Sequence, residues 1–324
     1  MPASPPPEPE PAVQEESIRI ENLSRTFGQI AAVAGVSFSV RAGEMFGIIG
    51  PDGAGKTTLI RMLCGILAPG GGSAVVLGRD LRRETDLIKR EIGYLSQRFS
   101  LYGDLTVDEN IEFFAEINNV YDYHARRDEL LEFTRLTPFR DRLAERLSGG
   151  MKQKLALACT LIHTPKLIFL DEPTTGVDPV SRRDFWKILQ SLQKEGITIV
   201  MSTPYLDEAE RCSRIALMHR GAVLRVDTPA NIKGLMAGDV AELIVDRVRD
   251  AYALLKGQPA TRDVQAFGDR INVIVDRAAA DLPPLELLLR DAGIRIDGRR
   301  IIRPSLENVF IYLLEHQPET AGVS

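Results

Sequence analysis

The feature that most constrains the fold is a glycine-rich run at residues 50–58, with the sequence GPDGAGKTT. It fits the pattern G-x-x-x-x-G-K-[ST]. It lies between a short apolar segment, residues 45–49, and a segment with helical spacing of leucine and isoleucine, residues 56–67. In this strand–loop–helix context the glycines allow successive backbone N–H groups to face one anion. The helix that follows directs its positive N-terminal end at the same anion, so the sequence predicts a phosphate-binding loop.

Every residue of this loop is a candidate contact for the phosphates of a nucleotide: Gly50, Pro51, Asp52, Gly53, Ala54, Gly55, Lys56, Thr57 and Thr58. Lys56 would supply a positive charge to the β- and γ-phosphates, and Thr57 a hydroxyl group for Mg²⁺. A phosphate loop alone is compatible with a kinase, a GTPase or a motor protein. Other motifs are needed to choose among these classes.

Composition argues against several kinds of protein. The 324 residues include 40 basic and 45 acidic side chains, for a formal net charge of −5, whereas a dedicated nucleic-acid-binding protein is normally basic. The cysteines, Cys64, Cys159 and Cys212, are far apart and in no CxxC spacing. This favours buried apolar side chains in a reducing, cytoplasmic protein over a disulfide framework or a zinc site.

No segment supplies the roughly 20 apolar residues of a membrane-spanning helix, and residues 1–17 lack the apolar region of a signal peptide.

Two further motifs follow the phosphate loop. Residues 147–153 have the sequence LSGGMKQ ahead of a predicted helix, and residues 167–173 have the sequence LIFLDEP. In motif order and spacing, residues 18–236 resemble the ATP-binding subunit of ABC transporters. The longer run 147–179 and the C-terminal run 304–316 (PSLENVFIYLLEH) are similar to multidrug-exporter ATPases of the daunorubicin-resistance type. Those proteins typically carry a C-terminal extension of this size.

The resemblance implies roles for the residues of these two motifs. Asp171 would hold Mg²⁺ directly or through water, and Glu172 would orient the attacking water. A capping or salt-bridged turn is the structural alternative for this acidic pair. Ser148, Gly149 and Gly150 would close on the γ-phosphate that the other protomer holds, so the active unit would be a dimer with two shared sites. Met151 stands where the family usually has glutamine, and little effect is expected.

Three more positions match motifs of the family. Gln97, in YLSQRFSLY, would contact Mg²⁺ or the attacking water, unless it is simply a solvent-exposed glutamine. Phe27 aligns with the aromatic residue that stacks on adenine, and a core phenylalanine at the end of a strand is the alternative. Asp178, in GVDP, resembles the loop residue that contacts the opposite site.

The expected fold class is α/β. Apolar strands alternate with helices over most of the chain, which indicates parallel βαβ units. We expect a P-loop NTPase fold of the ABC ATPase type with an inserted helical subdomain and N-terminal antiparallel strands, plus a small C-terminal α+β domain. The predicted boundaries are a disordered Pro- and Glu-rich tail (1–16), an ATP-binding domain (17–236) with its helical subdomain at about 98–146, an accessory domain (240–316) and a terminal tail (317–324).

One position departs from the family pattern. In the loop after the predicted strand at residues 197–201, Pro204 stands where the family usually has histidine. Proline offers neither a ring nitrogen nor a backbone N–H, so a contact to the γ-phosphate would be missing. Either the chain pairs with a different ATPase, or Glu172 suffices. We expect Pro204→His to leave nucleotide affinity unchanged, and a large shift in ATP affinity measured by titration would contradict this.

The resemblance also implies partners. The cofactors would be ATP and Mg²⁺, and the chain would form a homodimer or a heterodimer with a second ABC ATPase. It would drive a separate membrane permease for export of drug-like or amphipathic solutes, from the cytoplasmic side of the cell membrane. It would contact the membrane only through that permease and would bind no nucleic acid. Aromatic residues between positions 97 and 116 would form the docking surface or belong to the core of the helical subdomain: Phe99, Tyr102, Phe113 and Phe114.

Two other function classes fit the sequence less well. A non-transport ABC ATPase of the translation type has two modules in one chain, and this chain has one. The repair type inserts a long coiled coil, for which residues 97–148 leave no room. A small-molecule P-loop kinase would not carry the LSGG run.

Overall fold

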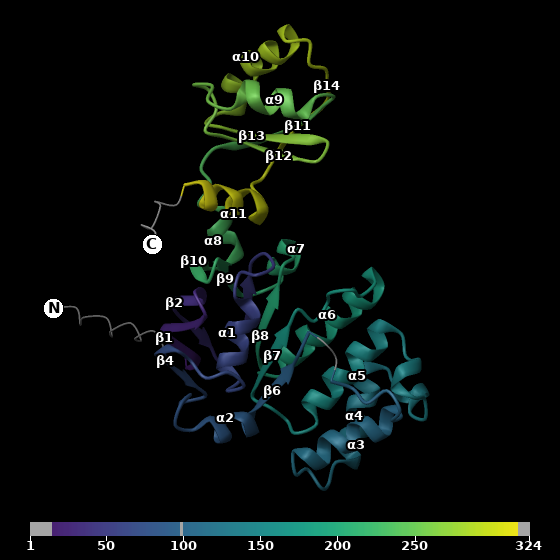
Figure 1. Ribbon diagram of the computed structural model, residues 1–324. Coiled ribbons are helices and arrows are strands. Elements are labelled where there is room, and N and C mark those ends of the chain that lie inside the picture. The colour runs from purple at the N-terminus through teal and green to yellow at the C-terminus, as the bar shows by residue number, and fades with distance from the viewer. Residues whose placement is uncertain (1–14, 98–99, 317–324) are drawn as a thin grey trace, which may run out of the picture. The chain divides into compact units, whose positions relative to one another are not determined.

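The computed structural model describes residues 15–97 and 100–316, which form two compact units on either side of residues 226 and 227 (Figure 1). The predicted tail at 317–324 and most of the one at 1–16 lie outside the described residues. The first strand, however, begins at Glu16, inside the predicted tail, because Glu16 pairs with Arg41. The short helix α8 (Pro229–Lys233) groups with the second unit, where it contacts helix α11 (Leu306–Glu315). The predicted ATP-binding domain (17–236) includes this helix, whereas its contacts assign it to the second unit.

The first unit is built on a largely parallel sheet with strand order β10-β9-β3-β8-β7-β6. Its strands are β3 (Met45–Ile49), β6 (Ile92–Leu95), β7 (Leu167–Asp171), β8 (Thr198–Thr203), β9 (Arg214–His219) and β10 (Ala222–Asp227). Strands β3, β7 and β8 are buried along their whole length, as expected for parallel strands covered on both faces. The parallel βαβ prediction is confirmed.

A second, antiparallel sheet has the order β2-β1-β4-β5. Its strands are β1 (Glu16–Phe27), β2 (Ile30–Arg41), β4 (Gly71–Val76) and β5 (Arg79–Asp80). The N-terminal antiparallel strands are therefore confirmed. The sequence does not predict strand β4, because glycines are depleted in strands and two of them begin this one. Gly72 has φ 71°, and a Cβ there would lie 2.2 Å from the Asn22 carbonyl oxygen, so glycine is what allows this strand to pair.

The helical subdomain is confirmed by helices α3 (Val107–Ile117), α4 (His124–Thr134) and α5 (Gly149–Leu161), which contact one another through α5 (Figure 1). Helix α5 begins before the predicted start at residue 154. The Ser148 side chain caps it by accepting a hydrogen bond from the Met151 N–H at 3.3 Å. The remaining helices of this unit are α1 (Lys56–Leu63), α2 (Thr85–Glu91), α6 (Pro179–Lys194) and α7 (Leu206–Ala209). Helix α1 ends short of the predicted residue 67, since Gly65 adopts a left-handed conformation with φ 67°.

The second unit has an antiparallel sheet of order β12-β13-β11-β14, which confirms the α+β expectation. Its strands are β11 (Asp239–Val245), β12 (Asp263–Phe267), β13 (Arg270–Val275) and β14 (Ile296–Ile302), and its longer helices are α9 (Val248–Leu255) and α10 (Ala278–Asp291). Helices α9 and α10 share one apolar cluster with the sheet, including Leu243, Leu255 and Leu289. Helix α11 contacts β12, and the Asn308 side-chain amide donates to Gln265 Oε1 at 2.8 Å.

Candidate nucleotide-binding site

The phosphate loop joins β3 to α1 and turns through two glycines in left-handed conformations. Gly53 has φ 77° and Gly55 has φ 101°. A Cβ at Gly55 would lie 2.1 Å from the Ala32 carbonyl oxygen, and one at Gly50 would lie 2.1 Å from the Met218 carbonyl oxygen. Both backbone conformation and close packing therefore require glycine in this loop.

A cavity of about 570 Å³ lies over the loop. Predicted site residues that line it are Asp52, Gly53, Ala54, Gly55, Lys56, Thr57, Thr58, Gln97 and Glu172. Four further lining residues were not predicted: Ile30, Ala31, Ala32 and Arg220. They come from β2 and from the β9–β10 turn, and no local motif marks them. The backbone N–H groups of the loop, its threonines and Lys56 lie at the N-terminus of α1. They make this side of the cavity polar and suited to an anion.

Lys56 and Glu172 form a buried ion pair in this cavity. The Lys56 side chain is 3% exposed, and its Nζ lies 3.2 Å from Glu172 Oε1. Lys56 also donates to the carbonyl oxygens of Gly50 (2.8 Å) and Pro51 (3.0 Å). Gln97 Nε2 donates to Glu172 Oε2 at 3.0 Å. The three residues predicted to be catalytic thus meet at one point, although they come from distant parts of the chain.

The predicted Mg²⁺ ligands lie beside this ion pair. Thr57 Oγ1 donates to Asp171 Oδ1 at 3.0 Å, and Ser202 Oγ donates to the same oxygen at 2.7 Å. The other carboxylate oxygen, Asp171 Oδ2, is buried without a hydrogen-bond partner. A buried, unpartnered carboxylate oxygen next to a threonine hydroxyl fits a hard cation such as Mg²⁺. Sequence reasoning missed Ser202, for which the only signal was a polar residue at the end of an apolar strand.

Glu172 has an unusual backbone conformation for a glutamate, with φ 48°. This left-handed conformation costs about 1–3 kcal/mol for a residue with a side chain. The Glu172 N–H donates to the Ser202 carbonyl oxygen (3.2 Å) and hydroxyl (3.0 Å), so the end of β8 holds the strained residue in place. This backbone conformation directs the Glu172 carboxylate from the end of β7 toward the cavity.

The LSGG residues lie outside this cavity. Ser148 and Gly149 are exposed at the start of α5, and a Cβ at Gly149 would meet no atom within 4 Å. Gly150 is buried, and a Cβ there would lie 2.3 Å from Ser181 Oγ. Asp178 is exposed and caps α6 by accepting hydrogen bonds from the N–H groups of Val180 and Ser181. The hydrogen bonds from Ser181 lower the pKa of the Asp178 carboxyl group.

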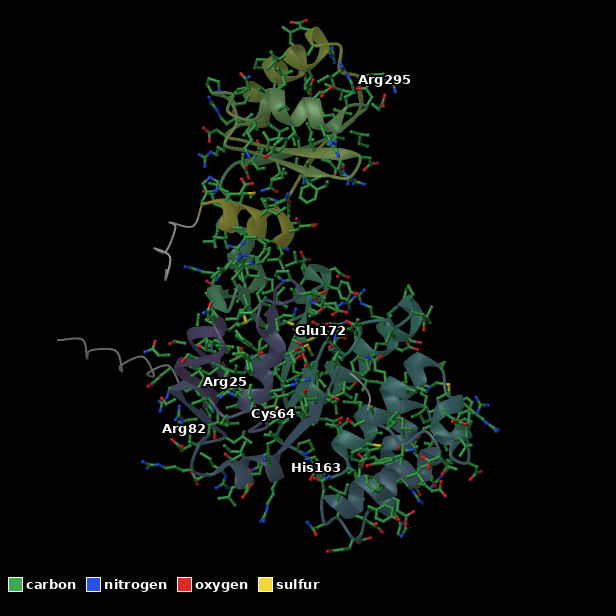
Figure 2. The ribbon with its side chains drawn as sticks, viewed as in Figure 1. Arg25, Cys64, Arg82, His163, Glu172 and Arg295 are labelled. Atoms are coloured by element: carbon green, nitrogen blue, oxygen red, sulfur yellow. The ribbon has the colours of Figure 1, made fainter. Side chains whose placement is uncertain are left out.

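Phe27 ends β1 with 47% of its surface exposed, so the alternative of a core phenylalanine is wrong. Its ring lies 5.1 Å from the guanidinium carbon of Arg25, which is labelled in Figure 2. Phe27 is outside the lining of the cavity but lies three residues before Ile30, which belongs to it. The cysteines are free and buried, as predicted, including Cys64 after α1 (Figure 2).

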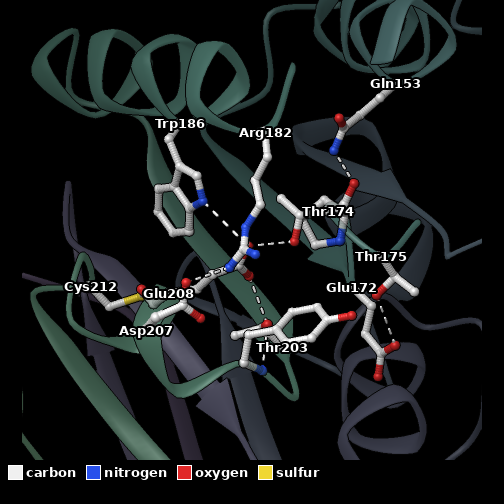
Figure 3. A network of polar contacts seen from close by, with 12 residues as sticks. Gln153, Glu172, Thr174, Thr175, Arg182, Trp186, Thr203, Asp207, Glu208 and Cys212 are labelled. Atoms are coloured by element: carbon white, nitrogen blue, oxygen red, sulfur yellow. Dashed lines mark hydrogen bonds and ion pairs between the residues drawn. The ribbon is translucent and has the colours of Figure 1, made fainter. Parts of the chain in front are cut away.

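A buried polar network adjoins the acidic pair (Figure 3). Its centre is Glu208 of α7, which is 0% exposed. The carboxylate accepts hydrogen bonds from Thr174 Oγ1 (2.6 Å), Thr203 Oγ1 (2.7 Å), Arg182 Nε (2.6 Å) and Trp186 Nε1 (3.4 Å). The network ties the segment after Glu172 to the end of β8 and to α6. Sequence reasoning missed it, because nothing local shows that Glu208 is buried.

Pro204 follows Thr203 of this network, and the aromatic residues predicted for the docking surface or the subdomain core lie on the helical subdomain. Pro204 is half-buried directly after β8 and lies outside the described lining of the cavity. Tyr102 is 44% exposed and its ring packs edge-on against Phe113 at 4.5 Å. Phe113 and Phe114 are half-buried, and Phe99 lies outside the described residues.

The chain is similar to known proteins along almost its whole length. A family model described as ABC transporter matches residues 33–175. Daunorubicin resistance ATP-binding protein DrrA2 of Streptomyces coeruleorubidus is 34% identical over 94% of this chain and 96% of its own. The probable multidrug ABC transporter ATP-binding protein YbhF of Escherichia coli is 42% identical over 69% of this chain, which spans only 39% of YbhF.

The chain is also similar in fold to solved structures of ATP-binding subunits. The structure of cbiO1 from Clostridium perfringens, described as part of the ABC transporter complex cbiONQ, has a TM-score of 0.62 and 27% identity, covering 68% of this chain and 92% of its own. The dimeric structure of the ATP-binding cassette MJ0796 bound to ADP and Pi has a TM-score of 0.59 and 26% identity, covering 65% and 98%. With this fold and these relatives, the chain belongs to the family of ABC transporter ATP-binding proteins.

Proposed function

We propose that this chain hydrolyses ATP as one half of a dimer of ABC modules and drives a separate membrane permease. The observation that carries the proposal is the meeting of Lys56, Gln97 and Glu172 above one phosphate loop, within one cavity. The soluble, non-transport alternative is disfavoured by the relatives, whose names refer to drug resistance and export.

The chemistry follows from the side chains. The loop amides and Lys56 bind the β- and γ-phosphates, and Lys56 exchanges its ion pair with Glu172 for the phosphate charge. Glu172, released from Lys56 and still oriented by Gln97, accepts a hydrogen bond from the attacking water and polarises it. Thr57 and Asp171 would hold Mg²⁺, which neutralises phosphate charge and orients the terminal phosphate.

The second half of each site would come from another protomer. Ser148 and Gly149 are exposed at the N-terminal end of α5, where backbone N–H groups favour an anion, and they do not line their own cavity. Asp178 is exposed in the same unit. The MJ0796 cassette, whose structure is described as dimeric and bound to ADP and Pi, is a precedent for dimer formation. We propose that these residues complete the partner's site.

Gly149→Ala tests the shared site. A Cβ at Gly149 meets open space, so we expect the free energy of unfolding to change by less than about 0.5 kcal/mol. ATP affinity of the isolated chain should also be unchanged. Hydrolysis should fall roughly tenfold, because the added methyl group displaces the phosphate across the dimer. Unchanged turnover would contradict the shared site. Gly150→Ala is the contrast, since its Cβ overlaps Ser181 and should destabilise the fold.

The transport role rests on the names of similar proteins. In the described residues, no helix combines the length and apolar character needed to cross a bilayer. Similar proteins are named for daunorubicin resistance, linearmycin resistance and Nod factor export. We propose export of drug-like or amphipathic solutes, with the chain bound peripherally to a permease at the cytoplasmic face. Tyr102 and the half-buried Phe114, which lines a small cavity of about 40 Å³ with Leu101 and Cys159, would form part of the docking surface.

The experiment is ATP hydrolysis by the purified chain alone, with a second ABC ATPase, and with a permease in lipid vesicles. Hydrolysis by the chain alone would indicate a homodimer that tolerates Pro204. Activity that needs a second ATPase would indicate a heterodimer with unequal sites. Background hydrolysis in every combination would overturn the proposed function. ATP-dependent accumulation of a fluorescent amphipathic drug in inside-out vesicles tests the export direction.

A further inference from the structure

The turn between β9 and β10 is fixed against the phosphate loop. The Gly221 N–H donates to the Ala54 carbonyl oxygen at 2.9 Å, and the Gly221 carbonyl oxygen accepts from the Ala34 N–H at 2.8 Å. A Cβ at Gly221 would lie 2.6 Å from the Ala31 carbonyl oxygen. The turn therefore occupies a defined position between the loop and the start of β2, and it carries its neighbour, Arg220, to the cavity.

Arg220 adopts a conformation that an arginine does not favour. Its φ is 46°, in the left-handed region where glycine or asparagine is preferred. A strained residue at a cavity points to a role for its side chain. Among the described residues, the Arg220 guanidinium takes part in no hydrogen bond or ion pair, so no internal contact explains why an arginine stands here.

The charges that line the cavity are unequally paired. Lys56 is engaged by Glu172 at 3.2 Å, and the other described charged side chains of the lining are Asp52 and Arg220. Arg220 is thus the cation of this lining without an ion pair. The pKa of His219, the residue before Arg220, is lowered. Burial is the larger cause, and the positive charge of Arg220 is the second.

We propose that Arg220 is a further nucleotide-binding residue, which binds the polyphosphate at its α-phosphate end. Ala31 and Ala32, next to the turn, lie at the start of β2, where Ile30 pairs with Phe27, the predicted adenine contact. Gln97 and Glu172 mark the terminal-phosphate end of the cavity. The planar guanidinium can donate two parallel hydrogen bonds to phosphate oxygens. The inference rests on the proposed nucleotide site and adds a contact that ATP and ADP share.

Arg220→Gly is the test, because glycine removes the charge and relieves the backbone conformation. We expect the melting temperature to stay the same or rise, while the Kd values for Mg-ATP and Mg-ADP both increase roughly tenfold. Arg220→Asn, which also tolerates this conformation, should show the same loss, and Arg220→Lys should retain most of the affinity. Arg83→Ala, at an exposed arginine outside the cavity, is the matched control and should bind as the wild type does.

The outcomes separate the two claims. If Arg220→Gly and Arg220→Asn bind both nucleotides within twofold of the wild type, the proposal is overturned. If only ATP binding weakens, the assignment to the α-phosphate end is overturned. If the wild-type chain binds neither nucleotide, the proposed function fails first, and the inference fails with it.

Discussion

Replacing Glu172 with glutamine is expected to lower ATP hydrolysis by at least about a hundredfold while the chain still binds ATP. General-base catalysis by a positioned carboxylate contributes about 10²–10⁴ in rate. Glutamine keeps the shape and the contact with Gln97 but cannot polarise water in the same way. It also removes the ion pair with Lys56, so Lys56 is freer to bind phosphate and ATP affinity should stay equal or increase. Steady-state phosphate release and nucleotide titration are the two measurements.

The matched control for this variant is Glu195→Gln, at an exposed glutamate after α6. It should hydrolyse ATP at the wild-type rate. If Glu172→Gln retained more than about a tenth of the activity, another group would have to activate the water. The position of Glu172 at the end of β7 would then contribute to the fold and not to hydrolysis.

The largest expected loss of stability comes from Arg182→Met. The substitution leaves the Glu208 carboxylate buried, with hydrogen bonds from Thr174, Thr203 and Trp186 but without the cation that Arg182 supplies. Breaking one side of a buried ion pair typically costs about 3–5 kcal/mol, and the remaining donors favour the lower end of this range. Chemical denaturation measures the loss.

Lys187→Met, on the same helix, is the control. Its ion pair with Asp184 has a lysine side chain that is 63% exposed, so the expected change in unfolding free energy is below about 1 kcal/mol. Adding Glu208→Gln to Arg182→Met should recover part of the stability, since the unpaired charge is removed. Equal denaturation midpoints for Arg182→Met and Lys187→Met would show that the Glu208 network does not stabilise the fold.

The network also bears on catalysis. Glu208 ties Thr174, two residues after Glu172, to Thr203, which precedes Pro204. Gln153 of α5 donates to the Pro173 carbonyl oxygen, also next to Glu172 (Figure 3). The segment around Glu172 is therefore held by contacts with three elements, β8, α7 and α5. The strained conformation of Glu172 needs such support, because the backbone alone would not hold it.

The parts of the site that were predictable are local in the chain. The phosphate loop, the end of β7 and the start of α5 are each marked by a few consecutive residues whose chemistry depends on backbone conformation. The same holds for β3, whose predicted and observed bounds agree. Strands β4 and β12 were not predictable from the sequence. Glycines begin β4, and β12 contains buried polar residues such as Asp263 and Gln265, so neither has the apolar pattern of a strand.

The sequence alone determined the P-loop class, the order of its motifs and most of the residues that line the cavity over the phosphate loop, since short-range spacing encodes them. Only the tertiary structure showed that Ser202 holds both Asp171 and the backbone of Glu172, that Glu208 is buried among four donors, and that Arg220 lines the cavity. These contacts join strands that are distant in sequence and adjacent in the sheet. Their burial and charge pairing arise only when the parallel strands align, and no local pattern records that alignment.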